Sequence, residues 1–421
     1  MKAMFRQATV ATLAMLWVGA APLAAQTPGN SRGQVLFATP DKYNVPYRIP
    51  ALATTRKGTI IAVADRRYCG ADIGYGRIDI VARTSRDNGR TWSADTVIQR
   101  GSGVEGAYDC GYGDAAIVAD RTSNRVLCMS VTGNVAYIQG TRERPNRIAR
   151  WYSPDGGRSW TPADDVTDAF YAMLPHTRTM FIGSGRLMQS RLVRKGRYYR
   201  VYCSVLTRTA MPDGSDVAAN FVIYTDDFGA TWHVLGGTTL DAADSPCVGG
   251  DEPKVEELPN GDVVLSSRKH YGRYFNIFHF DDFGHDQTNG WWDACVASHD
   301  IAEGISVGGN SCNGEIFLVD ATEAATGRAV KLMLQSLPFD DARAHVGIWY
   351  KEIKRNGWYS TAAFAHQWTR GLIVSQTGSA YSTMAMQKDG RIGFFYEEEP
   401  NYYNMVYVAL TIEEITGGRY R

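Results

Sequence analysis

Short apolar or alternating runs, each followed by a turn rich in Gly and Asp, succeed one another along most of the chain. The runs at 78–83 and 220–224 are two examples. Runs of this kind are typical of β-strands, and little of the sequence has the apolar period of a helix. No linker, charge block or low-complexity tract separates Gln26 from Arg421. The pattern therefore predicts an all-β fold of repeated hairpins in one domain, residues 26–421.

One eight-residue segment occurs three times, at Ser85–Trp92, Ser153–Trp160 and Thr225–Trp232, with copies 68 and 72 residues apart. The shared pattern is Ser/Thr-x-Asp-x-Gly-x-Thr/Ser-Trp, and Phe280–Gly284 begins a degenerate fourth copy in which Trp291 is displaced by an insertion. In a hairpin turn, Asp bonds backbone groups, Gly supplies a positive φ and Trp covers the hairpin base. The repetition predicts a propeller or another repeat array.

Residues 1–25 have the features of a secretory signal peptide. Lys2 and Arg6 form the positive start, residues 8–21 are almost wholly apolar, and Leu23-Ala-Ala25 fits a cleavage site. A membrane anchor is the alternative interpretation, but so short a run rarely spans a bilayer. We expect the protein to be exported, to the periplasm or out of the cell.

Composition narrows the possible partners. Removing Lys2 and Arg6 from 44 basic residues leaves 42, against 44 acidic residues. This balance gives no indication of nucleic-acid or membrane-surface binding, and no other segment is apolar enough for membrane insertion. The seven Cys residues lack metal-ligand spacing, and an odd number leaves at least one thiol free in a monomer.

Three predicted hairpins carry charged residues or Tyr at the ends far from their turns. A single such hairpin is typical of solvated strand ends. In a propeller, however, strand ends converge on one pocket, and a bulge would shift each pairing by one residue. The paired ends are Arg48 with Arg67, Glu252 with Arg268, and Tyr381 with Glu397, across predicted turns at Lys57-Gly58, Asn260-Gly261 and Asp389-Gly390.

Tyr47-Arg-Ile-Pro50, followed by the repeated segments, resembles the bacterial exo-α-sialidases, whose repeats are called Asp boxes. The resemblance covers nearly the whole chain after the signal. A single Asp box also occurs in unrelated secreted β-proteins, so the combination with Arg-Ile-Pro and the three hairpins carries the resemblance. It implies a six-bladed β-propeller that removes terminal sialic acids from sialylated glycans. It also implies a retaining mechanism with a tyrosine nucleophile and no metal or organic cofactor.

The resemblance implies an arginine triad at Arg48, Arg268 and Arg343, although the loop before Arg343 departs from the common pattern. Glu397 matches the carboxylate that supports the first arginine. Guanidinium groups bind carboxylates bidentately and stay charged, and sialic acid carries a carboxylate on its anomeric carbon. Three converging arginines repel one another when the site is empty, so the cluster favours an anion site over a structural role.

The resemblance also implies three catalytic residues. Tyr381 matches the nucleophile, Glu252 its base and Asp72 the acid/base. The loop of Asp72 lacks the Pro often seen after the family's acid/base and is one residue longer before the next strand. Asp79 is therefore a rival, although its place between Ile78 and Ile80 favours a strand residue.

Other positions match substrate contacts. Arg67 and Asp114 resemble positions around the O4 and N-acetyl groups of the sugar. The Trp residues that often line the N-acetyl pocket are not obvious here, and Tyr137 is a substitute candidate.

Three alternatives to hydrolysis stay open. A trans-sialidase of the same fold would pass the sugar to a hydroxyl other than water. A non-catalytic sialoglycan-binding propeller would keep the arginines but need not keep Tyr381, Glu252 and Asp72. An unrelated Asp-box scaffold would make the arginine set a coincidence.

Overall fold

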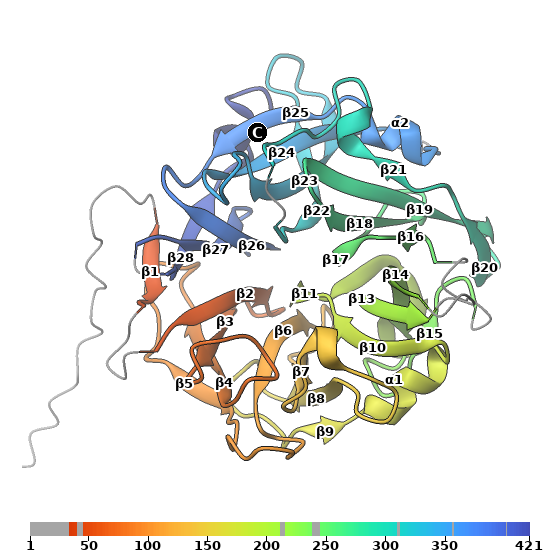
Figure 1. Ribbon diagram of the computed structural model, residues 1–421. Coiled ribbons are helices and arrows are strands. Elements are labelled where there is room, and N and C mark those ends of the chain that lie inside the picture. Colours follow the sequence, from red (N-terminus) through yellow and green to blue (C-terminus); the bar gives the residue numbers. More distant parts are fainter. Residues whose placement is uncertain are drawn as a thin grey trace, which may run out of the picture.

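The structure is a computed structural model that describes residues 33–39, 45–210, 215–237, 245–309, 312–355, 358–400 and 402–421. The described residues form six sheets arranged around a central axis, as a six-bladed β-propeller (Figure 1). This confirms the predicted fold. The expected signal, residues 1–25, lies outside the described residues. Every helix within the described ranges is too short or too polar to cross a bilayer.

The first three blades are formed by strands between residues 47 and 248. Blade 1 has β2 (Tyr47–Thr54), β3 (Ile60–Arg67), β4 (Ile78–Ser85) and β5 (Thr96–Gln99). Blade 2 has β6 (Tyr112–Ala119), β7 (Val126–Thr132), β8 (Arg147–Ser153) and β9 (Asp164–Asp165), with β11 (Gly185–Arg186) parallel to β6. Blade 3 has β10 (Thr177–Ile182), β12 (Met188–Lys195), β13 (Tyr198–Ala210), β14 (Asp216–Thr225), β15 (His233–Val234) and β16 (Cys247–Val248).

The remaining blades and the helices complete the described chain. Blade 4 has β17 (Asp251–Glu257), β18 (Val263–Lys269), β19 (Gly272–Asp282), β20 (Asp286–Trp292) and β21 (Val296–Ala297). Blade 5 has β22 (Ile316–Thr322), β23 (Ala329–Pro338), β24 (Val346–Ile353) and β25 (Thr369–Ile373). Blade 6 has β26 (Ser379–Met386), β27 (Ile392–Glu398), β28 (Asn404–Leu410) and β1 (Gln34–Phe37). The helices are α1 (Thr167–Met173), α2 (Thr361–Ala365), α3 (Ile412–Thr416) and the short 3-10 turns Tyr137–Gln139 and Ser298–Asp300.

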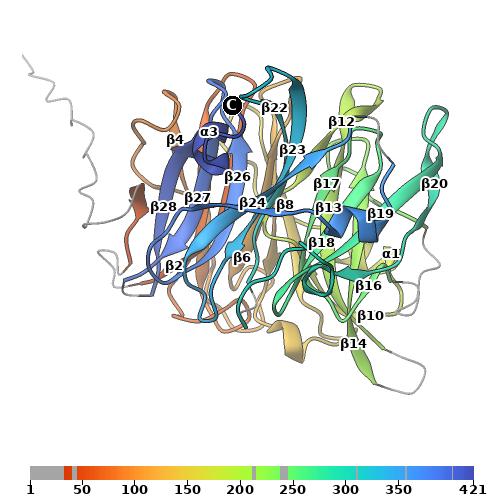
Figure 2. The same cartoon turned by 90° about the horizontal axis from the view of Figure 1, so that it is seen from above.

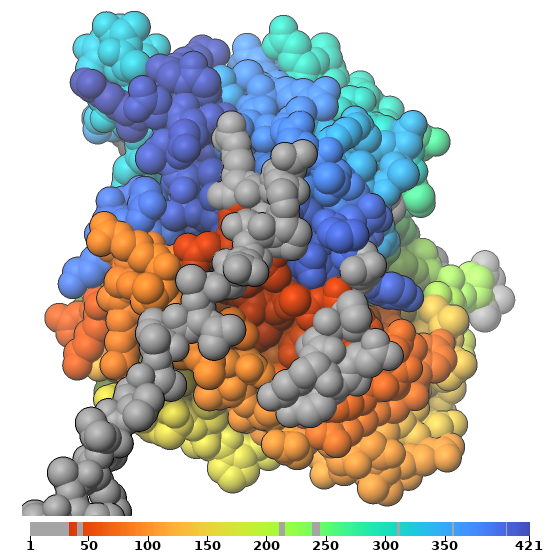
Figure 3. Space-filling model, turned by 90° about the vertical axis from the view of Figure 1, so that its left-hand side faces the viewer, coloured from red at the N-terminus to blue at the C-terminus, as the bar shows by residue number. Residues whose placement is uncertain are grey.

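Blade 6 closes the ring with strands from both ends of the described chain. The strand β1 pairs antiparallel with β28, and red and blue segments therefore meet on the side shown in Figure 3. Phe37 is buried and packs on Tyr47 of blade 1 and Phe395 of blade 6, with ring centroids 5.1 and 6.4 Å away. The blades stand side by side around the axis when the molecule is turned (Figure 2). Because each blade packs between two others, strands such as β3 are buried along their whole length.

The three hairpin turns are one residue longer than predicted. Thr55 N–H donates to Thr59 O at 2.8 Å, so three residues form the loop, and the other two hairpins close in the same way. The last loop residue of each is a left-handed Gly, at Gly58, Gly261 and Gly390, with φ of 86°, 97° and 84°. A three-residue loop that ends in a left-handed Gly is a favoured hairpin connection.

The expected pairing of Arg48 with Arg67 is wrong. Arg48 pairs with Asp65, and the backbone N–H of Arg67 donates to Pro46 O at 3.0 Å. The longer turn and a bulge in β2 between Arg48 and Ala51 move the register.

The three repeated segments connect β4 to β5 in blade 1, β8 to β9 in blade 2 and β14 to β15 in blade 3. In the first copy, Asp87 Oδ1 accepts from Thr91 N at 2.9 Å, and Ser85 Oγ accepts from Gly89 N at 2.9 Å. The other copies repeat these bonds around Asp155 and Asp227. The fourth segment lies between β19 and β20 of blade 4, but Gly284 does not have a positive φ. Its insertion therefore replaces the shared turn with a different one.

Candidate active site

The predicted site residues meet where the innermost strands of the blades begin. Four of these strands, β2, β6, β17 and β26, each carry a bulge at that end. A bulge turns a strand and re-aims a side chain that would otherwise alternate between its two faces. The bulges lie at or beside Arg48, Asp114, Glu252 and Tyr381. Four β-bulges thus direct side chains into the central channel of the propeller.

The resulting pocket has a volume of about 270 Å³. Its wall contains eight of the nine predicted site residues, together with an apolar patch of Tyr137, Phe181 and Leu206 and the backbone around Ile49. The ninth, Glu397, is fully buried behind it. The eight are Arg48, Arg67, Asp72, Asp114, Glu252, Arg268, Arg343 and Tyr381.

Glu397 organises the backbone and side chains at one side of the pocket. Its Oε1 accepts from Arg48 Nε at 2.7 Å and from Ile49 N at 2.8 Å, and its Oε2 accepts from Tyr381 N at 3.2 Å. Burial opposes the charge on Arg48, but the facing carboxylate of Glu397 outweighs it, so the pKa of Arg48 is raised. Arg48 therefore presents a fixed positive charge, and Tyr403 packs 5.0 Å from its guanidinium carbon.

Tyr381 lies between a base and an arginine. Its hydroxyl donates to Glu252 Oε1 at 2.9 Å and accepts from Arg268 Nη1 at 3.0 Å. The same Nη1 donates to Glu252 Oε2 at 2.7 Å. Burial and the Glu252 charge raise the pKa of Tyr381 well above its usual value, while Arg268 and Arg343 oppose that shift. In the empty pocket the phenol therefore keeps its proton, with an acceptor for it already in contact.

The third predicted arginine approaches the same ring. The guanidinium carbons of Arg48 and Arg343 lie 5.6 and 5.7 Å from the centre of the Tyr381 ring. Arg268 reaches the hydroxyl end of that ring. Three cations from blades 1, 4 and 5 thus surround one tyrosine, as an anion site next to a nucleophile would require.

Arg67 joins the acidic residues of blades 1 and 2. It forms ion pairs with Asp65 at 3.0 Å, with Asp72 at 2.9 Å and with Asp114 at 3.7 Å. Burial raises the pKa of Asp65 to about 6, against the opposing charge of Arg67. Burial and the charge of Asp65 raise the pKa of Asp114 well above its usual value. A raised pKa shifts Asp114 toward its protonated form, which carries a hydrogen-bond donor.

Of the two candidates for the acid, only Asp72 borders the pocket. Its side chain is 65% exposed, on the loop between β3 and β4. Asp79 is fully buried, and its two oxygens accept from Arg77 and from Gly101 N. All of its contacts are structural, as its position within a strand indicated.

Four residues at the site were not predicted from the sequence: Asp65, Asp251, Phe181 and Leu206. Asp65 is fully buried and its carboxylate accepts from Asp114 N as well as from Arg67. A charged residue directly before Arg66-Arg67, inside an otherwise apolar strand, was the available signal. Asp251 lies 3.3 Å from Arg268 and precedes Glu252 in the sequence. Phe181 and Leu206 are ordinary strand residues, and no pattern marks them out.

Three of the ten non-Gly residues with a positive φ in the described chain line the pocket. Ile49, Asp114 and Arg343 have φ values of 59°, 56° and 51°. A β-branched residue such as Ile rarely adopts this left-handed conformation, and strained residues of this kind cluster at functional sites. The bond from Ile49 N to Glu397 holds one of these conformations in place.

The sequence of this chain is similar to those of several curated sialidases. The chain is 27% identical over 379 residues to a sialidase of Micromonospora viridifaciens, covering 83% of this chain and 50% of that protein. It is 24% identical over 361 residues to a sialidase of Clostridium perfringens, covering 79% of this chain and 87% of that protein. The chain thus spans half the length of the Micromonospora relative. No family model matches it.

Solved structures with the same fold include a sialidase and an intramolecular trans-sialidase. The Hadza microbial sialidase Hz136 superposes with a TM-score of 0.69 at 21% identity, over 91% of this chain and 69% of that one. The intramolecular trans-sialidase of Ruminococcus gnavus superposes with a TM-score of 0.67 at 16% identity, over 91% of this chain and 98% of that one. Together, these comparisons confirm that the chain resembles the sialidase family, as its motifs predicted.

Proposed function

We propose that this protein is an exo-α-sialidase, a retaining glycoside hydrolase that removes terminal sialic acids from glycoproteins, glycolipids and oligosaccharides with Tyr381 as nucleophile. The observation that carries the proposal is the placement of the Tyr381 hydroxyl, 2.9 Å from Glu252 and 3.0 Å from Arg268, inside a pocket whose lining includes the three predicted triad arginines.

In this proposal the arginines bind the substrate carboxylate. Arg48, Arg268 and Arg343 remain charged at any working pH and present planar donor groups. Binding the carboxylate offsets their mutual repulsion and places the anomeric carbon next to the Tyr381 ring. Three arginines cannot stabilise the positive charge that develops on the sugar ring in the oxocarbenium-like transition state. In the proposal, the substrate's own carboxylate and the nearby acidic residues stabilise it.

A tyrosine suits this substrate better than a carboxylate nucleophile. A carboxylate would approach the substrate's own carboxylate, and two like charges about 4 Å apart cost roughly 4 kcal/mol in a partly solvated site. A neutral phenol avoids this repulsion. Its pKa is high, so attack requires that Glu252 accept the phenolic proton as the new bond forms.

Turnover then takes two displacements. In the first, Tyr381 Oη bonds to the anomeric carbon, its proton passes to Glu252, and the glycosidic C–O bond breaks as Asp72 protonates the leaving oxygen. In the second, Asp72 removes a proton from water, the water oxygen bonds to the anomeric carbon, and the C–O bond to Tyr381 breaks as Glu252 returns its proton. Two inversions give net retention.

The side-chain positions support these roles. Asp72 is exposed at the rim, where the leaving group would exit. Tyr381 and Glu252 lie deeper in the pocket, with only 7% of Tyr381 exposed. The apolar patch of Tyr137, Phe181 and Leu206 is suited to an acyl methyl group. Export through residues 1–25 is part of the same proposal, because sialylated glycans are extracellular.

A trans-sialidase is the second candidate. Intramolecular trans-sialidases are among the solved structures that share the fold, from Ruminococcus gnavus and from leech. In such an enzyme, a sugar hydroxyl replaces water in the second displacement. Mass spectrometry of the product separates the candidates, because hydrolysis gives free sialic acid and intramolecular transfer gives the anhydro sugar, which is lighter by one water.

The test is release of 4-methylumbelliferone from its α-sialoside by the purified protein and by Tyr381→Phe. We expect turnover by the wild type and a loss of more than about a hundredfold in the variant, with sialoside binding retained. Binding without turnover in both proteins would contradict the enzyme proposal and favour the glycan-binding propeller. Near-normal turnover in Tyr381→Phe would contradict the nucleophile assignment alone.

A further inference from the structure

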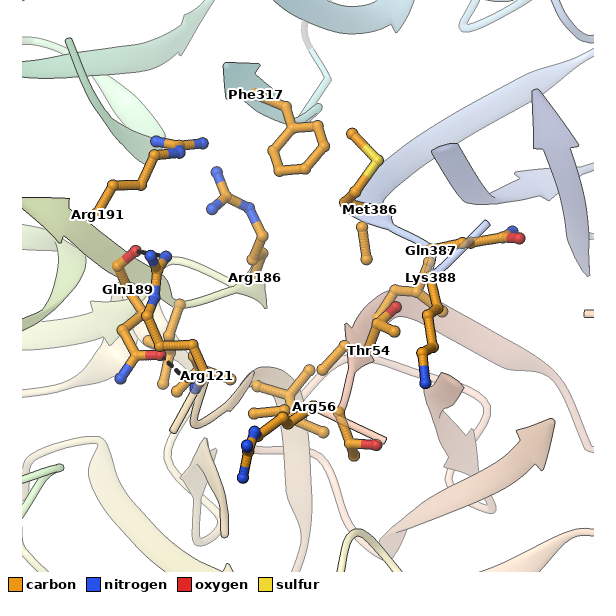
Figure 4. Close-up of a pocket in the computed structure, with 18 of the residues that line it drawn as sticks. Thr54, Arg56, Arg121, Arg186, Gln189, Arg191, Phe317, Met386, Gln387 and Lys388 are labelled. Atoms are coloured by element: carbon orange, nitrogen blue, oxygen red, sulfur yellow. Dashed lines mark hydrogen bonds between the residues drawn. The ribbon is translucent and has the colours of Figure 1, made fainter. Parts of the chain in front are cut away.

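A second cavity lies at the opposite end of the propeller channel. The active-site pocket is formed where β2, β6, β17 and β26 begin, whereas this cavity is formed where β2, β6 and β26 end, and by β11, β12 and β22. Its volume is about 450 Å³. We call it the distal pocket, and Figure 4 shows its lining residues around an open centre.

The lining of the distal pocket carries a large excess of positive charge. The cationic side chains come from four blades: Arg56, Arg121, Arg186, Arg191 and Lys388. Asp320 is the one acidic residue among the lining residues. Its side chain is 85% exposed and forms an ion pair with Lys331 at 2.5 Å. The lining therefore contains five cations and one carboxylate that is already paired.

Acidic residues behind the wall neutralise only part of this charge. Arg186 and Arg191 share one carboxylate, Glu256, at 2.8 and 2.7 Å. Glu315 lies 3.6 Å from Arg186 but also faces Lys254 at 3.7 Å. Glu257 accepts from Arg191 N, and burial raises its pKa. Arg186, Arg191 and the buried Lys254 thus share the carboxylates behind the wall, and the remaining positive charge of the lining comes from its other three cations.

Three further cations face the cavity without a carboxylate partner in the described chain. Arg121 donates from Nη2 to the backbone oxygen of Gln189 at 3.0 Å. Loss of hydration and the nearby charge of Arg191 lower the pKa of Arg121. Arg56 and Lys388 are exposed at the mouth, and neither forms an ion pair with a described residue. Like charges converging in this way are stabilised by an anion between them.

One wall of the pocket is apolar. Phe317 lies with its ring centre 4.9 Å from the guanidinium carbon of Arg186, as Figure 4 shows beside the open centre, and Met386 lines the wall nearby. A small inorganic ion would leave this surface uncovered. A ligand that combines an oxyanion with an apolar body would use both parts of the lining.

We propose that the distal pocket binds an organic phosphate, with the dianionic phosphate among Arg121, Arg191 and Arg186 and the apolar body against Phe317. Arg121, together with Arg56 and Lys388 at the mouth, has no carboxylate partner in the described chain, so a dianion compensates the charge of these cations better than a single carboxylate. Arg presents its donors in a planar fork suited to phosphate oxygens. The proposal does not depend on the proposed enzymatic function, because the distal pocket shares no lining residue with the active-site pocket.

The test uses isothermal titration calorimetry of the full protein with phenyl phosphate at fixed ionic strength. Inorganic phosphate and benzoate provide comparisons for the phosphate alone and for a monoanion with the same ring. The variants are Arg121→Gln and Lys388→Gln, and Arg100→Gln is the matched control because Arg100 is exposed beyond β5 and lines neither pocket. Phosphate that binds at the active site contributes equally to every protein in this series.

We expect phenyl phosphate to bind more tightly than either comparison compound. Its Kd should rise about tenfold in Arg121→Gln and about fivefold in Lys388→Gln, with no change in Arg100→Gln. Lys388 is exposed, so its variant remains informative if Arg121→Gln is unstable. Equal affinity for phenyl phosphate and inorganic phosphate, or the same Kd in Lys388→Gln and Arg100→Gln, would overturn the proposal.

Discussion

Single residues of this site perform more than one task. Glu397 binds the Arg48 side chain, the strained backbone at Ile49 and the backbone N–H of Tyr381. It has no solvent exposure, so its charge must be compensated by protein donors such as these. The orientation of the first arginine and the position of the nucleophile are thus coupled through one carboxylate.

We predict that Glu397→Gln lowers both substrate affinity and stability. The amide keeps the shape of the side chain, but its NH2 group faces donors, and Arg48 loses its counter-charge. The free energy of unfolding should fall by roughly 3 kcal/mol, and KM should rise about tenfold or more. Chemical denaturation and steady-state kinetics measure these effects. Glu323→Gln, in an exposed pair with Arg328, is the control and should change neither quantity.

We predict that Arg268→Ala raises KM and lowers kcat, because Arg268 contacts the nucleophile, its base and, in the proposal, the substrate carboxylate. A charge-assisted hydrogen bond contributes about 1.5–3 kcal/mol, so kcat/KM should fall by roughly 10- to 100-fold or more. Arg328→Ala removes an exposed arginine of blade 5 and serves as the control. An unchanged KM in Arg268→Ala would place the anion site elsewhere.

The sequence predicted most polar side chains of the pocket, because they are charged residues or Tyr at strand ends or in the adjoining loops. Asp65 escaped notice since its carboxylate acts inside a strand, through the backbone of a residue 49 positions away. The apolar patch also escaped notice, because Phe181 and Leu206 look like core residues until the fold brings them together. The role of Asp65 and the position of the apolar patch both depend on contacts between distant parts of the chain, which a local sequence pattern does not reveal.

At the scale of elements, the repeated turns are stabilised by carboxylates. Each central Asp accepts backbone and hydroxyl donors of its own turn, and these bonds outweigh the small effect of burial, so the pKa values of Asp87, Asp155 and Asp227 are lowered. For Asp87 the value is about 2. An unfolded Asp titrates near pH 4, so the folded state binds this proton less tightly.

We predict that Asp87→Asn reduces stability in a pH-dependent way. A lowered pKa gives stabilisation that is fully present above about pH 4 and is lost as the pH falls toward about 2. The Tm difference between wild type and Asp87→Asn should therefore be present at pH 6 and shrink on acidification. Asp281→Asn, on an exposed residue, should show no such trend. A difference that stays constant from pH 6 to pH 3 would contradict the role of the charge.

For the three hairpins, the sequence predicted the strands but not the length of the loops between them. The strands, the position of each Gly and the neighbours Glu252 and Arg268 were predicted. Loop length was not, because two- and three-residue loops share the same Gly signal. Because the loop has one more residue than predicted and β2 has a bulge, Arg48 pairs with Asp65 instead of Arg67.

At the scale of the whole molecule, closure of the ring depends on a short first strand. Leu36 and Phe37 are almost fully buried, and they join blade 6 to the beginning of blade 1. The repeats predicted a ring or array, whereas the number of blades came from the family resemblance. Only three blades carry the shared turn, so a count of repeats alone would have given too few.

We predict that Phe37→Ala lowers the free energy of unfolding by about 3–5 kcal/mol, as expected for deletion of a buried aromatic ring. The loss should also increase proteolysis near the junction of blades 1 and 6, which limited digestion followed by mass spectrometry would reveal. Arg100→Ala, at an exposed position of blade 1, is the control. A change below about 1 kcal/mol would show that β1 contributes little to closure.

The most direct test of the central claim is to trap the intermediate on the protein. In 2,3-difluorosialic acid, fluoride leaves the anomeric carbon while the second fluorine slows release of the sugar, so the covalent intermediate accumulates. Intact-mass measurement followed by peptide mapping should find one adduct, on Tyr381, and none in Tyr381→Phe. An adduct on Glu252 or Asp72, or turnover by the wild type with no adduct at all, would contradict the account.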